Sequence, residues 1–141
     1  MKRIVSACLI AIVAGAVTSR AEIAAQSAES LQAGATHIVV GTVKFIGTHE
    51  EKDAKWLKTS GVVEVQVDAI EKGKRIEPGD AVYARFWQQG WIGKGNPPPS
   101  GSGHRLPKKG DRVRVFLQQK EGGYDALLPN GFEVSPEASK P

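Results

Sequence analysis

The chain has 141 residues, with 19 lysines and arginines, 15 acidic residues and one cysteine. Lys2, Arg3 and Arg20 lie within the first 21 positions, so residues 22–141 carry 16 basic and 15 acidic side chains. Because a net charge of about +1 attracts polyanions only weakly, we expect no nucleic-acid partner. The 120 residues that follow position 21 are enough for one domain with a modest core.

The first 21 residues have the pattern of an export signal. A basic start (Met1–Arg3) precedes an apolar run at 4–17, and Ser19–Ala21 has the small-x-small pattern of a cleavage site. The apolar run is shorter than the roughly 20 residues that span a bilayer, so we expect no stable membrane span. The lipobox-like sequence at 5–8, which ends in Cys8, precedes most of the apolar run and is a poor alternative. We predict cleavage after Ala21.

Cysteine usage suggests where the protein acts and where it comes from. Cys8 leaves with the signal, so residues 22–141 form no disulfide. An exported eukaryotic domain of this size is more often rich in disulfides. We therefore expect a bacterial protein that is secreted or periplasmic, and monomeric.

The next residues predict one short helix and then a series of strands. Residues 22–34 place apolar and small side chains at helical spacing, and Gly34 ends the pattern. Beyond it the apolar period is two, which is typical of half-buried strands. The predicted strands are 37–48, 62–70, 81–88, 112–119, 124–128 and 132–134.

The alternation within these strands assigns one face to the core and the other to solvent. Gly41 lies on the inward side, where a missing side chain permits a sharp bend or a close backbone approach. Ile70 breaks the parity, which predicts a bulge near Ala69. The inward residues are Val39, Val43, Phe45, Val63, Val65, Val67, Val82, Ala84, Phe86, Val113, Val115 and Leu117; the outward row contains Tyr83, Arg85, Trp87, Arg112 and Arg114.

The short strands and the turn signals between them favour a small all-β barrel or sandwich over residues 35–134. Within it we expect a charged loop or hairpin end at 49–60 and a long loop at 89–107. The tail at 135–141 is expected to be disordered.

Four segments occur in an order that is similar to a known family. They are HIVVGTVKFIG, GVVEVQVDAIEKG, PGDAVYARF and KKGDRVRVFL, and together they cover about residues 35–117. This order resembles the bacterial relatives of the netrin-like domain, the OB-type barrel also found in tissue inhibitors of metalloproteinases. The resemblance implies a five- to six-stranded OB-type barrel. It does not imply protease inhibition, because those inhibitors place an N-terminal cysteine on the catalytic zinc and residues 22–141 contain no cysteine.

The loop at 89–107 and the end of the predicted strand before it hold the candidate ligand-binding residues. Loops of this length are usually functional or disordered, and plain linkers seldom carry tryptophans. Trp87 and Trp91 can stack on a sugar ring or a base, with His104, Arg105 and, behind them, Arg85 as polar partners. The alternative is that both indoles only cover the open end of the barrel.

Patterns for other chemistry are weak or missing. Lys94 is followed by Gly95 and prolines rather than by a helix, so no phosphate-binding P-loop is expected. His37, His49 and His104 are not at metal-ligand spacing, and the acids beside His49 are typical of a solvated turn. Neither a Gly-x-Ser-x-Gly motif nor a cysteine nucleophile is present in residues 22–141. We expect no metal, no cofactor and no catalytic residue.

The sequence thus favours an exported, non-catalytic binding or interaction module whose partner is a saccharide or a protein of the cell envelope. A metal-dependent hydrolytic enzyme that uses His104, His49 and loop carboxylates is one alternative. A structural envelope protein without a soluble ligand is the other.

Overall fold

The computed structural model describes residues 24–97 and 103–135. The expected signal with Cys8, the central part of the long loop and the residues of the tail after 135 lie outside the described residues. The elements are α1 (Ala28–Gly34), β1 (His37–Lys52), β2 (Trp56–Lys72), β3 (Ala81–Trp91), β4 (Arg112–Lys120), β5 (Gly123–Ala126) and β6 (Phe132–Val134).

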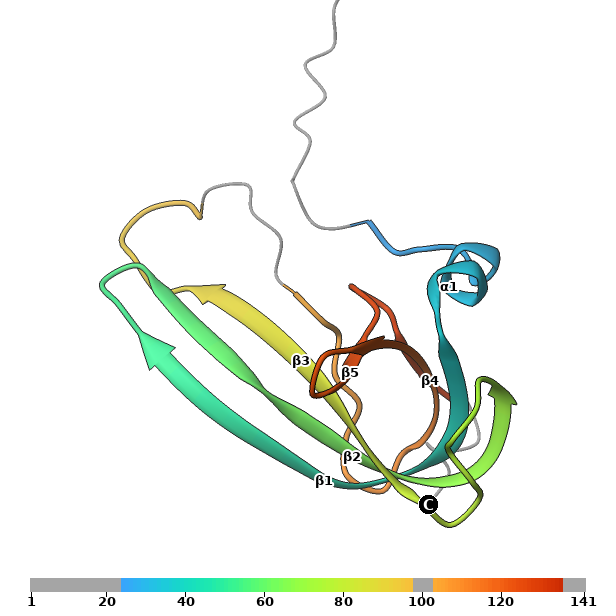
Figure 1. The fold of residues 1–141 in the computed structure, drawn as a ribbon. Coiled ribbons are helices and arrows are strands. Elements are labelled where there is room, and N and C mark those ends of the chain that lie inside the picture. The colour runs from blue at the N-terminus through green and yellow to red at the C-terminus, as the bar shows by residue number, and fades with distance from the viewer. Residues whose placement is uncertain (1–23, 98–102, 136–141) are drawn as a thin grey trace, which may run out of the picture.

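Five of these strands close into a barrel (Figure 1). The order is β1-β2-β3-β5-β4, and β4 pairs again with β1 through residues 112–117. The β3–β5 pair is parallel and the other pairs are antiparallel; β6 is an extra strand on β4. The predicted fold class, a small all-β barrel of five to six strands after a short helix, is confirmed.

The barrel is filled by the side chains that alternation assigned to the core. β-branched residues dominate because they suit the pleated surface of a strand. The fully buried members include Val39, Val43, Val63, Val65, Val67, Ala84, Val113, Val115 and Leu117. A second, smaller cluster lies under α1 and joins Leu31, Ala35, Ile38 and Phe116. The helix begins after Ser27, whose hydroxyl accepts a hydrogen bond from the Ser30 N–H at 3.1 Å.

Bulges in β1 and β2 explain where the alternation holds and where it fails. The β1–β2 register shifts before the Val39–Ile70 pair and after the Val40–Ala69 pair, so the bulge predicted near Ala69 is confirmed. A further shift between Val43 and Phe45 was not predicted. Because a one-residue shift turns every following side chain to the other face, Phe45 is 54% exposed. Its assignment to the core was wrong.

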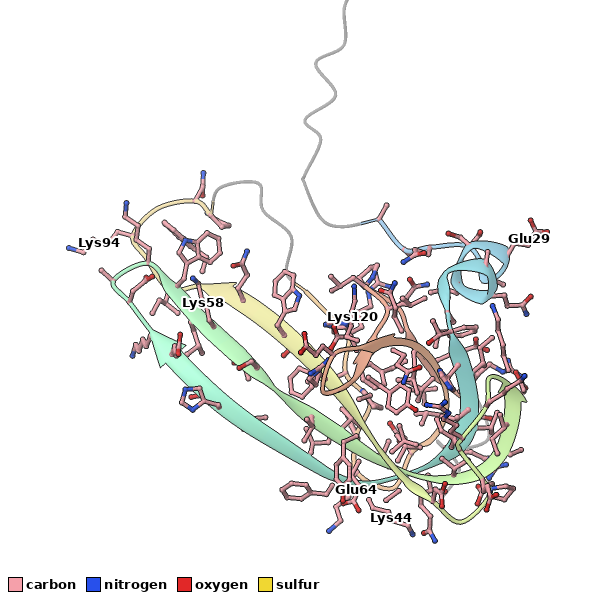
Figure 2. All side chains as sticks on the ribbon, in the orientation of Figure 1. Glu29, Lys44, Lys58, Glu64, Lys94 and Lys120 are labelled. Atoms are coloured by element: carbon pink, nitrogen blue, oxygen red, sulfur yellow. The ribbon has the colours of Figure 1, made fainter. Side chains whose placement is uncertain are left out.

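The first three strands are longer than the sequence suggested. β1 continues to Lys52 and β2 begins at Trp56, so of the two alternatives expected for 49–60, a loop or a hairpin end, the structure has the hairpin. β3 continues to Trp91, so 89–91, expected in the long loop, are strand. We call residues 48–60 and 87–91 the extension, because these parts of β1, β2 and β3 project past the barrel (Figure 1). In Figure 2, Lys58 and Lys94 mark this part of the molecule, whereas Lys44 and Glu64 lie near the barrel.

The turn at the end of the extension is held by one carboxylate. Asp53 Oδ1 accepts hydrogen bonds from the backbone N–H groups of Lys55 and Trp56, at 2.8 and 2.7 Å. These bonds favour the ionised carboxylate, so they lower the pKa of Asp53 below its usual value of 3.8. An Asp turn of this kind reverses the chain within a few residues, which lets two charged segments pair as strands.

Candidate functional site

The outward face of β3 carries a row of large side chains. The β2–β3 register runs from Trp56–Trp91 to Gln66–Ala81 without a shift, so side chains two apart on β3 share a face. Val82, Ala84 and Phe86 are buried, and the opposite face is formed by Tyr83, Arg85, Trp87, Gln89 and Trp91. Tyr83 is 52% exposed and Trp87 36%, so this row can meet a ligand.

Trp91 packs against Trp56, a residue that the sequence analysis did not select. The two side chains are cross-strand partners, and their rings meet edge to face with centroids 5.1 Å apart at 74°. The Trp91 Nε1–H donates to the Gly95 carbonyl at 3.2 Å. Trp56 was missed because it lies among charged residues; the β-forming run Trp56-Leu57-Lys58-Thr59 was the available signal.

Trp87 contacts His104, which lies at the return of the long loop to the barrel. The rings are 6.4 Å apart and nearly perpendicular. His104 is only 5% exposed. Its Nε2 lies 2.7 Å from the Ala126 carbonyl, and its Nδ1 lies 3.1 Å from the Trp87 N–H. Since a carbonyl only accepts, Nε2–H donates to Ala126, and Nδ1 accepts from Trp87.

The segment that leads into His104 approaches β3 very closely at Gly103. Gly103 forms a bridge with Gln88, and the Gln88 Nε2 donates to the His104 carbonyl at 2.8 Å. A Cβ at Gly103 would lie 2.3 Å from the Trp87 carbonyl oxygen, and its φ of +90° suits glycine. This end of the loop is therefore attached to the sheet.

The two candidate arginines lie in different settings. Arg85 is on the same face as Trp87 and forms an ion pair with Asp125, 2.5 Å between Nε and Oδ1. Its Nη1 also lies 3.4 Å from the Glu121 carbonyl. Arg105 is exposed, and its backbone N–H donates to the Pro129 carbonyl at 2.9 Å. Arg85 is thus held in place, whereas the Arg105 side chain faces solvent.

The other two outward arginines do not extend the β3 row. They lie on β4, which does not pair with β3: β5 lies between the two strands on one side of the barrel, and β1 and β2 on the other. Arg112 pairs with Asp68 at 2.7 Å. Arg114 bridges Glu71 and Glu133 at 2.9 and 3.2 Å, and its hydrogen bond with Glu71 raises the pKa of its guanidinium. The mixed basic and aromatic face expected from the sequence is therefore two separate surfaces.

The histidines are not gathered at one place. The His37 ring lies 2.9 Å from the Thr36 hydroxyl and 2.8 Å from the Lys74 carbonyl, and His104 uses both nitrogens on the backbone. His49 is exposed, 3.6 Å from Glu51. Within the part of the chain that the structure describes, no three His, Cys, Asp or Glu side chains are placed to hold a metal ion.

The structure thus joins Trp87 to His104 and Trp91 to Trp56, along one face of β3. Trp87 and Trp91 are four residues apart on a strand, about 13 Å, so each indole presents its own contact surface. Over residues 24–97 and 103–135, no helix has the length and apolar character needed to cross a membrane. Comparison with protein-family models, with curated proteins and with solved structures finds no match to this chain.

Proposed function

We propose that this protein is an exported, non-catalytic binding module that holds a saccharide along the outward face of β3. The observation that carries the proposal is the row formed by Tyr83, Trp87 and Trp91, which places an aromatic side chain at intervals along one exposed strand face. Aromatic rings offer large, rigid apolar surfaces with polar atoms at their edges, which suits the apolar faces and hydroxyl rims of sugar rings.

The spacing of the row favours an oligosaccharide over a single sugar. Tyr83 and Trp91 are eight residues apart on β3, which is about 27 Å along a strand. Polar side chains lie between and beside the rings: Arg85 on β3, and Lys58 and Ser60 on the neighbouring β2. Such groups supply the hydrogen bonds that orient a polar ligand.

The strand order also supports the resemblance seen in the sequence. We propose that the barrel is of the OB or netrin-like type, because the order β1-β2-β3-β5-β4 with a parallel β3–β5 pair fits a five-stranded barrel of that kind. Secretion is part of the same proposal. Expressed with its leader in a bacterium, the protein is expected to begin at Glu22, which N-terminal sequencing checks; an intact Met1 terminus would contradict export by cleavage.

The binding proposal is tested by tryptophan fluorescence. Titration with chitotetraose and with methyl-esterified tetragalacturonate, two neutral oligosaccharides, is expected to change the emission of the wild-type protein. Trp91→Ala and Trp87→Ala are expected to weaken binding about tenfold or more, because each removes a stacking surface. Trp91→Phe keeps an aromatic ring and is expected to retain most of the affinity.

The matched control is Ile92→Ala. Ile92 is 41% exposed and adjoins Trp91, but it lies beyond the end of β3. Its truncation is expected to leave the affinity unchanged, with the thermal midpoint of every variant measured in parallel. Unchanged affinity in both tryptophan-to-alanine variants, or no response to either oligosaccharide, would overturn the proposal.

A further inference from the structure

A pocket of about 450 Å³ opens beside the first residues of β3. It lies between β3, the connection that precedes it and the turn between β4 and β5, and its volume is within the range of small-molecule sites. Residues that line it include Arg75, Ile76, Tyr83, Arg85, Gly123 and Tyr124. Tyr83 and Arg85 also belong to the outward row of β3, so the pocket is continuous with that row.

Arg75 has an unusual backbone for its residue type. Its φ is +72°, and it is the one non-glycine residue with positive φ among the described residues. This conformation costs on the order of 1 kcal/mol or more in a residue with a Cβ. Arg75 is exposed and makes no hydrogen bond or ion pair within the described part of the chain. Neither a contact nor packing accounts for an arginine here.

Of the two arginines that line the pocket, Arg75 is the one without an ion pair among the described residues. Arg85 is paired with Asp125. Asp80 also lines the pocket as a carboxylate; its Oδ2 is engaged by the Glu77 N–H at 2.9 Å within its own turn, and it forms no ion pair with Arg75. The guanidinium of Arg75 is thus the group that a ligand can pair with, and its planar fork matches a carboxylate.

The remaining walls suit a ring. Ile76 and Val82 are 8% and 4% exposed and contribute apolar surface. Tyr124 is held by an edge-to-face contact with His37, 5.0 Å between centroids, and Tyr83 stands at the rim. A ring with one apolar face and one acid group therefore fits these walls.

We propose that this pocket binds the carboxylate-bearing end unit of an oligosaccharide, an acidic sugar whose carboxylate pairs with Arg75. The inference rests on the proposed function, because the rest of the ligand then lies along Trp87 and Trp91. The pocket sets the orientation of the oligosaccharide along β3 and favours an acidic ligand over a neutral one. The aromatic row alone does neither.

The experiment compares tetragalacturonate with its methyl ester, in which a methyl group on each carboxyl removes the charge, by ¹H–¹⁵N NMR titration of the purified protein. Both ligands are expected to shift the indole signals of Trp87 and Trp91. Only the acid is expected to shift the amide signals of Gly122 and Gly123, which face Arg85 in the pocket wall. The acid is expected to bind about tenfold more tightly, as a charge-assisted hydrogen bond allows, and 500 mM NaCl is expected to remove most of this preference.

Three variants connect the preference to Arg75. Arg75→Ala is expected to bind the acid and the ester equally. Arg75→Gly is expected to lose the preference with an unchanged or higher thermal midpoint, since glycine adopts positive φ without a steric penalty. Lys74→Ala removes the same charge one residue away, outside the pocket lining, and is expected to keep the preference.

The outcomes separate this inference from the proposed function. Retention of the acid preference in Arg75→Ala, or equal shifts at Gly122 and Gly123 with the ester, would overturn the acidic subsite and leave binding at the tryptophans intact. Shifts at Gly122 and Gly123 with the acid alone, without a response from Trp87 or Trp91, would overturn the proposed function and support the pocket as an acid site.

Discussion

Trp87 and His104 are joined by two hydrogen bonds in opposite directions. The His104 backbone N–H donates to the Trp87 carbonyl at 2.9 Å, and the Trp87 N–H donates to the His104 ring at Nδ1. The other ring nitrogen reaches the Ala126 carbonyl on β5. One buried imidazole therefore connects the return of the long loop to two strands of the barrel, and it fixes the backbone from which the Trp87 indole projects.

His104→Ala is expected to destabilise the protein by about 2–3 kcal/mol, because it leaves the Trp87 N–H and the Ala126 carbonyl without their partner in a buried setting. Urea denaturation measures this change. His49→Ala is the matched control: the His49 side chain is 73% exposed, so its effect is expected to stay within about 0.5 kcal/mol. Equal stabilities of the two variants would mean that the His104 ring does not hold the loop.

The Trp56–Trp91 pair is expected to stabilise the end of the extension. Their edge-to-face contact predicts a coupling free energy of about 0.5–1.5 kcal/mol. A double-mutant cycle with Trp56→Ala and Trp91→Ala, followed by urea denaturation, measures it. The pair Trp56 and Trp87, which are not cross-strand partners, serves as the reference and is expected to give a coupling near zero. A coupling near zero for both pairs would contradict the edge-to-face packing of Trp56 against Trp91.

The Asp53 turn predicts an acid-sensitive hairpin end. Hydrogen bonds from Lys55 and Trp56 lower the pKa of Asp53 in the folded state below 3.8. Its contribution to stability is therefore present above pH 3.8 and is lost as the pH falls through the folded-state pKa. NMR titration of the Asp53 carboxyl carbon is expected to give a midpoint below 3.8, with the Lys55 and Trp56 amides shifting over the same range. In Asp53→Asn these amide shifts are expected to disappear; a midpoint at or above 3.8 would contradict the turn geometry.

The core of the barrel could be predicted from period-two patterns. Inward side chains such as Val63, Val65 and Val67 occupy every second position, because the strand has no bulge between them. Phe45 could not be assigned in this way, since the bulge at Lys44 depends on how β1 meets β2, and no local pattern marks it. Residue spacing also placed Trp87 on the outward face of its strand correctly, whereas Trp91 was expected in the loop at 89–107 and lies at the end of β3.

The sequence alone could not predict which side chains contact each other across strands. The contacts of Trp91 with Trp56 and of Trp87 with His104 depend on the register and on the return path of the loop, which no residue spacing reveals. The same limit applies to Arg112 and Arg114. They alternate correctly, but their place on β4 separates them from the β3 row that they were grouped with.

Gly41 lies where β1 pairs with β2 on one side and with β4 on the other, and the sequence predicted a close approach there. A Cβ at Gly41 would lie 2.0 Å from the Gln66 carbonyl oxygen. Because backbone atoms of a closed barrel cannot easily move away, Gly41→Ala is expected to lower the free energy of unfolding by at least about 2 kcal/mol.

Gly90→Ala is the matched control on β3: no atom lies within 4 Å of its added Cβ, so this variant is expected to be as stable as the wild type or up to about 0.5 kcal/mol more stable. Thermal and urea unfolding of both variants measure the difference. Equal stabilities would show that β1 does not pass so close to β2 at this point.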